Sequence, residues 1–531
     1  MIEQRDTARA VQDEYTKGCG FKRRLGLYEQ VKKNERFYLG DQWHGLKVKT
    51  ITPVTLNFLR RVLTYFQAMV VSDDIGVQIR PFLPDEARES AGKVYEKAIE
   101  RVIERCKLKT LNRESLRDAC VDGDSLMYFW FDPDEPSGQT LAEGDIRAEL
   151  LMNTNVIFGN PASSEVQTQP YIIIARRRPV KEVRREAEKN GVTDWERIQA
   201  DEGSEFVNGD KDDGDLLCTE LVRFWKEDGT VRTMRCVGDV VTEDAKDTGL
   251  SRYPMVWWSW ERRKNCFHGV SPMTEVIPTQ IAVNQLWTAV NMYVQMAGFP
   301  KVVYSRGKFP RGYDTSPGKA IAVEGDPREA LVNIQGGVQL PTAILSIIDG
   351  LVNKAMELMG VSDAAMGNVR PDNQSAIIAV QQATAAPLNL QRLAFYQFVE
   401  DQVRVLIDMM HTYYGVRTMM IRQETTNPMT GEVSEEEQPA QIDFGALELT
   451  SMDVNVDVGQ ASYWSQLMQI ESADNLFQRG MYADMADYLE DIPDGYIRNR
   501  DKLVRKLREK AKMLEAQQSQ QAAPIAAAAM Q

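Results

Sequence analysis

The sequence has little of what catalytic and metal sites are usually built from. It contains only three histidines, and its six cysteines are scattered, without a Cys-x-x-Cys pair. Such cysteines are typical of free thiols in a reducing compartment rather than of a disulfide framework. The P-loop, the GxSxG elbow, the GxGxxG fingerprint and the HExxH motif are also missing. The sequence therefore gives no support to the common classes of enzyme, and we expect no cofactor.

Two local sequence patterns could still form a catalytic or a metal-binding site. Cys266 and His268 lie two residues apart on a basic segment, a spacing that is not typical of a nucleophile–base pair. Asp122 and Asp124 could be paired metal ligands, but Asp and Gly before an apolar run more often form a turn that leads into a buried strand. If the chain were a cytosolic enzyme with an unrecognised acidic site, Asp122 and Asp124 would be the first place to look.

Two long stretches, residues 276–300 and 373–391, contain no charged residue, although one quarter of the residues of the chain are charged. Both read as helices that carry Gln and Asn. A helix of a soluble monomer keeps one charged face, and a bilayer helix avoids so many amides. We therefore expect helices that pack against other helices on most sides, with the Gln and Asn side chains hydrogen-bonding across the contacts between helices. Such helices favour a multi-subunit ring or bundle, and we expect no membrane span.

The net charge of −14 argues against a protein whose main task is to grip nucleic acid, because such proteins need clustered Lys and Arg. It is compatible with a surface past which DNA slides. The polar N-terminal segment has no apolar core of a secretory signal, so none is expected.

The pattern of apolar residues predicts a mixed α+β protein of two to four structural units. The Asp228-Gly229 pair predicts a β-hairpin turn, Pro179 and Gly191 the start and stop of a helix, and Pro387 a kink. The Trp257–Trp260 run reads as core rather than as a base-stacking surface. The expected helices are 55–71, the segment after Asp85, 272–298, 341–360, 375–414 and much of 463–514. The expected strands are 125–131, 171–175, 216–226, 230–237, 254–260 and alternating segments within 418–459, around an acidic hairpin loop at Glu435–Glu437.

Several segments, in order, resemble one family. They are NERFYLGDQW (34–43), DGDSLMYFWFDP (122–133), the segment 158–176, HGVSPMTEVIPTQIAVNQ (268–285) and GVSDAAMG (360–367). Together with the order of helices and strands, they are similar to the portal protein of tailed bacteriophages, the head-to-tail connector. The resemblance covers roughly residues 25–460.

The resemblance implies the fold of a ring subunit with a wing, a helical stem, a small β-rich clip and a helical C-terminal crown. In this sequence the corresponding ranges would be the N-terminal wing region 1–271, the stem helix 272–298, the clip 299–340, the second stem helix 341–360, the tunnel loop 361–374, the kinked wing helix and β segment 375–459, and the crown with its frayed tail 460–531.

The resemblance also implies a function and partners. The chain would form a ring, usually a dodecamer, at one vertex of the capsid, assembled in the cytoplasm of the bacterial host. Double-stranded DNA would enter and leave through it, and the terminase large subunit and a head-completion adaptor would dock on it, beside the major capsid and scaffolding proteins. Another ring-forming capsid or tail structural protein is the first alternative, and the cytosolic enzyme is the second.

Three sets of residues follow as candidate sites. The DNA-facing tunnel loop would present Asp363, Met366, Asn368, Arg370 and Asn373, with Arg370 as its one cation. The clip would meet a partner or DNA through Lys301, Arg306, Lys308, Arg311 and Lys319. Packing of the stem would involve Ile281, Asn284, Leu286, Val290 and Gln295.

Overall fold

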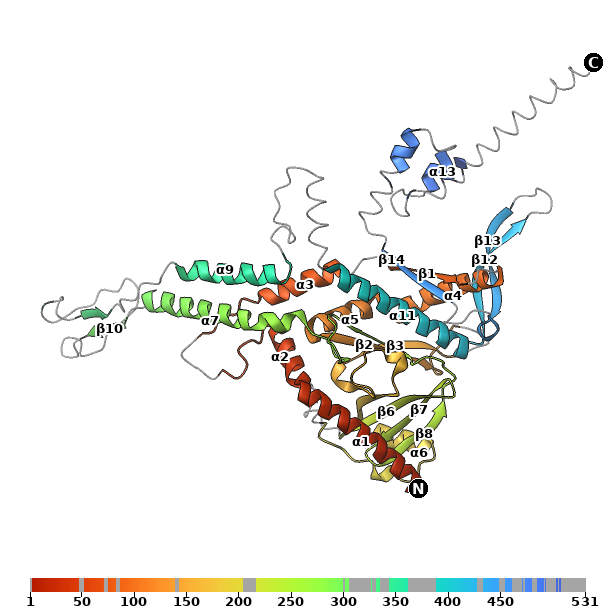
Figure 1. Cartoon of the computed structure of the whole chain (residues 1–531), viewed down its shortest axis with the longest axis horizontal. Coiled ribbons are helices and arrows are strands. Elements are labelled where there is room, and N and C mark those ends of the chain that lie inside the picture. The colour runs from red at the N-terminus through yellow and green to blue at the C-terminus, as the bar shows by residue number, and fades with distance from the viewer. Residues whose placement is uncertain are drawn as a thin grey trace, which may run out of the picture. The chain divides into compact units, whose positions relative to one another are not determined.

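The structure is a computed structural model (Figure 1), and it divides into two compact units. The first comprises Met1–Val71 and Ile79–Asp457, and the second comprises Ser72–Gln78 and Val458–Gln531. The described residues are 2–46, 52–70, 75–82, 86–138, 143–203, 216–298, 301–304, 326, 331–334, 343–361, 388–426, 433–447, 454–460, 470, 473–479, 485–490, 492, 503–504 and 506–507.

The fold is mixed α+β, as the sequence predicts. The helices are α1 (Ile2–Leu25), α2 (Leu27–Leu39), α3 (Phe58–Val70), α4 (Glu86–Arg105), α5 (Leu108–Asp122), α6 (Val180–Lys189), α7 (Pro272–Gly298), α9 (Ala343–Leu358), α11 (Asn389–Tyr413) and α13 (Met485–Glu490). The strands are β1 (Ile75–Pro81), β2 (Asp124–Asp132), β3 (Asp145–Leu151), β4 (Val156–Phe158), β5 (Tyr171–Pro179), β6 (Leu217–Glu227), β7 (Thr230–Val237), β8 (Val240–Asp247), β9 (Met255–Ser259), β10 (Lys301–Tyr304), β11 (Leu331–Ile334), β12 (Val416–Thr426), β13 (Val433–Asp443) and β14 (Val454–Gln460).

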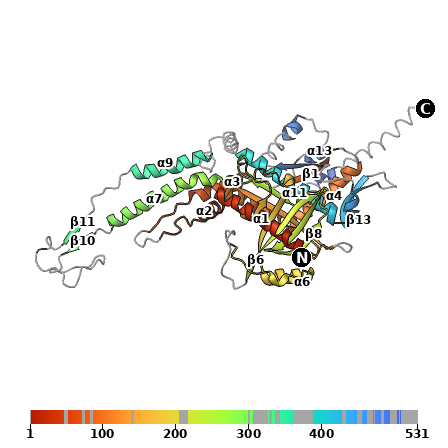
Figure 2. The same ribbon diagram turned by 60° about the horizontal axis from the view of Figure 1, so that its bottom comes forward.

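A five-stranded antiparallel sheet, in the order β4-β5-β6-β7-β8, lies in the first unit. The β6–β7 hairpin turns at Asp228 and Gly229, which both have positive φ, so the predicted turn is confirmed. Helix α1 packs on one face of the sheet, where Leu221 and Met234 point. Helix α6 packs on part of the opposite face, beside Cys218 and Val237. The sheet thus has helices on both faces (Figure 2).

A three-stranded sheet, β3-β2-β9, forms the centre of the same unit. The first six residues of β2 are buried, as expected of an apolar run. In β9, Trp258 packs against Phe395 and Phe398 of α11, while Trp257 contacts Phe267. These tryptophans are core residues, which confirms the prediction that they do not form a stacking surface.

Helices α7 and α9 lie side by side, away from both sheets, in Figure 1 and Figure 2. Strand β10 follows α7 directly and pairs with β11 in an antiparallel ribbon. Helix α7 has the bounds that the sequence predicts, and α9 is slightly shorter than the predicted 341–360. No helix within the described ranges has the length and apolar character that a membrane crossing requires.

Some local predictions are wrong. Helix α6 begins at Val180, one residue after Pro179, which ends β5 in an extended conformation. Glu435–Glu437 do not form a hairpin loop. They lie within β13, opposite Arg422–Glu424 of β12. Helix α5 and strands β3 and β8 were not anticipated. Pro387 lies outside the described residues, so its predicted kink stays a prediction.

The second unit includes α13. Leu489 of this helix packs with Ile492 and Val504, and the Tyr488 ring lies against Phe477 at 4.6 Å. The Tyr488 hydroxyl donates a hydrogen bond to Asp474. This small apolar cluster agrees with the prediction of a helical C-terminal region.

Candidate functional site

Helix α7 carries its polar side chains in a row rather than over its whole surface. Gln280, Asn284 and Thr288 lie four residues apart and are all buried. Asn284 accepts a hydrogen bond from the backbone N of Leu56 at 3.1 Å, and Thr288 accepts one from Val54 at 3.0 Å. Gln280 donates to the Leu56 carbonyl at 2.6 Å. The row therefore binds the main chain of segment 52–57, which has no regular secondary structure.

The regular spacing of this row has a geometric cause. Four residues of an α-helix rise about 6 Å, and two residues of an extended chain span about 6.6 Å. Asn284 and Thr288 can therefore accept from the backbone N–H groups of Leu56 and Val54, which lie two residues apart. The segment 52–57 has no strand partner among the described residues, so side chains of α7 satisfy its backbone. We call this segment the strap.

The strap corrects part of the expectation that the amides of this helix bond to other helices, because Gln280 reaches the start of α3 but Asn284 bonds to the strap and to Gln42. The partners of Gln280 and Asn284 are the strap, the start of α3, Gln42 and each other, all within one chain. Asn284 is 2% exposed, so the chain itself already buries this predicted packing residue.

The apolar side of α7 packs against α9. Val283 and Val290 are buried with Ile348, and Leu286 lies partly buried on the same cluster. Ile281 is half-buried and Gln295 is exposed. Of the five residues predicted to pack the stem, Asn284, Val290 and Leu286 contribute to contacts within the chain, whereas Ile281 and Gln295 remain accessible.

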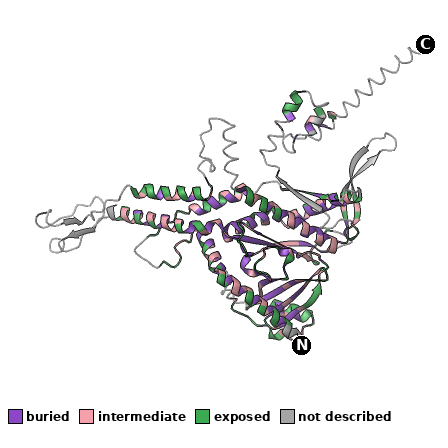
Figure 3. Cartoon of the chain, viewed as in Figure 1, coloured by how far each residue is buried: buried purple, intermediate pink, exposed green. Residues whose placement is uncertain are grey.

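The outward faces of α7 and α9 carry few charges and several exposed apolar side chains. Val294 on α7 is 58% exposed, and Ile347 and Leu358 on α9 are 52% and 78% exposed. Figure 3 shows exposed residues along α9. The exposed positions of α7 after Glu275 are all uncharged. An uncharged surface with exposed apolar side chains is typical of a protein–protein contact.

A buried polar cluster lies at the start of α7, and we call it the α7 base cluster. It comprises Lys22, Asp124, Asn153 and His268, each at most 3% exposed. His268 donates from Nδ1 to Asp124 at 2.9 Å, and the Gly269 amide donates to the same carboxylate at 2.8 Å. Asn153 donates to the other carboxylate oxygen.

Lys22 joins this cluster from α1. Its ammonium donates to the carbonyls of Asn153 at 2.7 Å, Thr154 at 2.9 Å and Val156. These three bonds use all the donors of an ammonium group. Burial lowers the pKa of Lys22 to about 7, and burial also lowers the pKa of His268, against the attraction of Asp124. The cluster connects α1, β2, the turn 153–155 and the residues that lead into α7.

The geometry does not support Cys266 as a nucleophile, nor Asp122 and Asp124 as paired metal ligands. Asp124 accepts hydrogen bonds from structural donors, and Asp122 is half-buried, with desolvation raising its pKa well above the ordinary value. Burial also raises the pKa of Cys266, which makes it a weaker nucleophile at neutral pH. In the described part of the chain, no group of three or more His, Cys, Asp or Glu residues could hold a metal ion.

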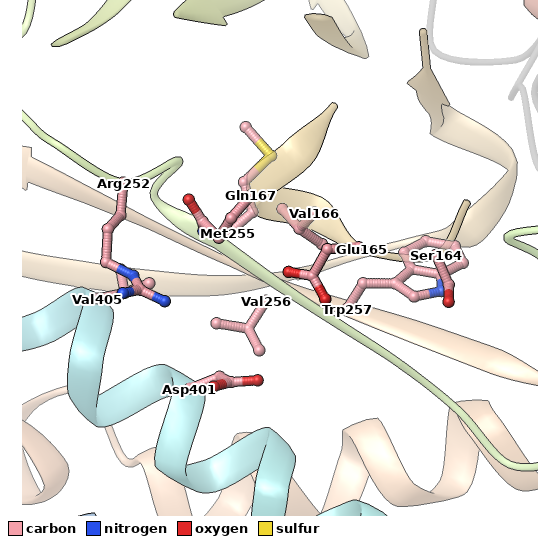
Figure 4. Close-up of a pocket in the computed structure, with 10 residues that line it drawn as sticks. All are labelled: Ser164, Glu165, Val166, Gln167, Arg252, Met255, Val256, Trp257, Asp401 and Val405. Atoms are coloured by element: carbon pink, nitrogen blue, oxygen red, sulfur yellow. The ribbon is translucent and has the colours of Figure 1, made fainter. Parts of the chain in front are cut away.

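A small pocket of about 70 Å³ lies between residues 164–167, the start of β9 and α11 (Figure 4). Glu165, Arg252 and Asp401 line it together with Trp257. Asp401 already accepts hydrogen bonds from Arg404 and Gln397. The volume suits a few water molecules and is too small for a nucleotide or a peptide side chain of the usual ligand-pocket size, roughly 300 Å³ and above.

The other two predicted sites fall outside the described residues. This applies to all five tunnel-loop residues, Asp363, Met366, Asn368, Arg370 and Asn373, and to Arg306, Lys308, Arg311 and Lys319 of the clip. Lys301 begins β10, opposite Ile334, and only its backbone is described. Their roles stay predictions.

Helix α7, which is uncharged after Glu275, and α9, with its exposed apolar side chains, form a helix pair with the features of an assembly surface. The comparison with protein families names the class, because the phage P22-like portal protein model matches residues 219–531, more than half of the chain. The chain belongs to the phage P22-like portal protein family. No curated protein matches it.

Membership of this family confirms the resemblance and decides between the alternatives. Portal proteins are structural components of the virion and not enzymes. They form oligomeric rings through which phage DNA passes. The match also includes residues 460–531, beyond the range over which the sequence motifs resemble the family.

Proposed function

We propose that twelve copies of this chain form a ring at one vertex of the capsid, assembled in the host cytoplasm. The ring serves as the channel through which double-stranded DNA is packaged and later ejected. It is also the docking platform for the terminase large subunit and for a head-completion adaptor, and during assembly it contacts the major capsid and scaffolding proteins. The family match is the observation that carries the proposal.

The faces of α7 and α9 support a ring in which they form the seams. In a cyclic ring each subunit uses two different faces, one for each neighbour. We infer that the uncharged outer face of α7, which includes Val294, packs on the outer face of α9 of the next subunit, around its exposed apolar residues Ile347 and Leu358. Rotational symmetry repeats every charge twelve times in a ring, so the uncharged outer face of α7 limits repulsion between copies.

The assignment of segments follows from this arrangement. Helices α7 and α9 would be the two stem helices, and 299–340 the clip, where β10 and β11 pair. Residues 361–374 would be the tunnel loop, with Arg370 facing DNA, and the cations from Lys301 to Lys319 would contact an acidic partner or the DNA backbone. The 1–271 and 375–459 ranges would form the wing, and 460–531 the crown.

The acidic balance of the chain supports passage of DNA rather than its capture. A net charge of −14 on each copy repels the phosphate backbone. Affinity for DNA rises with each phosphate that a cation neutralises, and many such contacts would slow movement through the channel.

The native mass of the purified chain, with end-on views from negative-stain microscopy, tests the proposal. Twelve copies of 60.2 kDa give a particle of about 722 kDa with a central hole. A different number of subunits would correct the stoichiometry and leave the ring intact. A chain that stays monomeric at high concentration and with its scaffolding protein added would contradict the proposed ring.

A further inference from the structure

A second, larger cavity lies within the first unit, where the five-stranded sheet, β2 and α11 meet. Its volume is about 320 Å³. The sheet face that lines it carries Val222, Phe224, Thr233 and Arg235, and α6 covers the neighbouring part of the same face. The cavity is at the lower end of the range of ligand pockets, roughly 300–1,000 Å³, a size that suits one large side chain.

Aromatic rings form most of the opposite wall. Tyr128 and Trp130 of β2 stack with ring centroids 5.7 Å apart, and Phe131 stacks on Tyr413 of α11 at 5.0 Å. Such walls favour another aromatic ring, since offset and edge-to-face contacts add to the gain from burial.

A guanidinium group supplies a polar contact at the same cavity. Arg235 lines it, and its Nε lies 3.0 Å from a carboxylate oxygen of Glu243. Glu243 also pairs with Lys246, another lining residue. Among the described residues, Arg235 makes this ion pair and no side-chain hydrogen bond. The Glu243 carboxylate therefore pairs with both Arg235 and Lys246. The Arg235 guanidinium has further N–H donors that can bind a second carboxylate.

We propose that this cavity binds the C-terminal residue of a partner polypeptide, where that residue is aromatic. The ring enters the cavity against Trp130 and against the edge of the Tyr128–Phe224 pair, whose centroids lie 5.9 Å apart, and the terminal carboxylate pairs with Arg235. A chain-terminal aromatic residue supplies both groups in one unit, which fits a cavity of this size. The whole site lies within one chain, so the proposal stands independently of the ring.

Three capped dipeptides test the proposal on the full-length protein by saturation-transfer difference NMR. Ac-Ala-Phe-OH carries the ring and the carboxylate, Ac-Ala-Phe-NH2 lacks the carboxylate, and Ac-Ala-Ala-OH lacks the ring. We expect saturable binding of the first, binding of the second that is weaker by roughly tenfold, as for a lost charge-assisted hydrogen bond, and none of the third. No saturable binding of Ac-Ala-Phe-OH, or equal binding of the acid and the amide, would overturn the proposal.

Two variants connect the binding to these residues. Arg235→Gln removes the cation and should make the acid bind as weakly as the amide, while binding of the amide stays unchanged. Arg232→Gln is the matched control, because Arg232 is on the same strand, faces the other side of the sheet and pairs with Glu227. Val222→Trp fills the cavity and should abolish binding of both Phe peptides. Unchanged selectivity for the acid in Arg235→Gln would place the carboxylate elsewhere and contradict the assignment.

Discussion

At the scale of single residues, the α7 base cluster shows how a charge is kept in the interior. The three backbone carbonyls that accept from Lys22 satisfy its ammonium, and three donors satisfy the Asp124 carboxylate. Such a buried, hydrogen-bonded set adds little net stability, but removing one member leaves the others without partners in the interior. The cluster therefore fixes the position of the residues that lead into α7 relative to α1 and β2.

Removing the Asp124 carboxylate should be strongly destabilising. Asp124→Ala leaves the donors of His268, Gly269 and Asn153 unpaired in the interior, with a buried lysine nearby. We expect the free energy of unfolding to fall by about 3–5 kcal/mol, as for other broken buried pairs. Urea denaturation at matched protein concentration measures it. Asp13→Ala, at an exposed position of α1, is the control and should change it by less than about 0.5 kcal/mol.

The buried lysine predicts a dependence of stability on pH. The pKa of Lys22 is about 7 in the folded chain and near 10.5 when unfolded. Between these values the unfolded state binds more protons, so this residue makes stability rise with pH from about 7 to about 10. Lys22→Met should be less stable, because it leaves three carbonyls unpaired, and should lose this part of the slope. Urea denaturation of both proteins from pH 7 to pH 9.5 tests this, and an unchanged slope would contradict the lowered pKa.

At the scale of elements, the strap explains why α7 is rich in amides without being rich in charge. Gln280, Asn284 and Thr288 serve the backbone of the strap, so the remaining surface of the helix can stay uncharged. The strap and the start of α3 follow one another in sequence, and both contact α7. The direction of α7 is therefore set by hydrogen bonds on one side and by apolar packing on α9 on another.

The central amide of the strap contact can be tested directly. Asn284→Leu removes the acceptor of the Leu56 amide and the acceptor of Gln280. We expect a loss of about 1–3 kcal/mol in the free energy of unfolding, since buried polar groups lose their partners. Gln285→Leu, one residue further along on the exposed side, is the matched control. Equal effects of the two substitutions would show that the hydrogen bonds between Asn284 and the strap do not contribute to the free energy of unfolding.

Substitutions at an exposed and at a buried position of α7 distinguish an effect on ring assembly from an effect on folding of the chain. Val294→Glu places a charge on the outer face, so it should leave the chain folded and prevent ring formation. Val283→Glu places a charge in the contact with Ile348, so it should destabilise the chain itself. Leu216→Glu, at an exposed residue of the same unit, is the control. Circular dichroism and native mass separate the outcomes, and normal rings from Val294→Glu would contradict the proposed seam.

The sequence predicts elements well where the signal is local. The long uncharged helix, the Asp228-Gly229 hairpin and the buried strands β2 and β9 follow from periodicity and turn chemistry. Contacts between distant segments were not predicted. His268 and Asp124 are far apart in the chain, and the strap has no pattern of its own, because its partners are side chains of α7 rather than a strand. The cavity at Arg235 likewise depends on how two sheets pack.

At the scale of the whole molecule, a portal must attract DNA enough to guide it and little enough to release it. The chain has 77 acidic and 63 basic residues, so an assembled ring is strongly acidic. Where DNA passes closest, single cations can guide the backbone without holding it, since affinity falls steeply as phosphate contacts are removed. Arg370 is the one cation of the proposed tunnel loop.

Reversal of the charge at Arg370 should therefore act on DNA movement and not on assembly. We expect Arg370→Glu rings of normal native mass that package less DNA, or retain it less well, because the loop then repels the phosphate backbone. Packaged DNA is measured by its protection from nuclease in assembled heads. Lys189→Glu, on the exposed end of α6, makes the same change of net charge away from the proposed channel and should package normally. Equal packaging by both variants would remove Arg370 from the DNA-facing residues, and a defect in both would show that net charge, rather than the tunnel loop, limits passage.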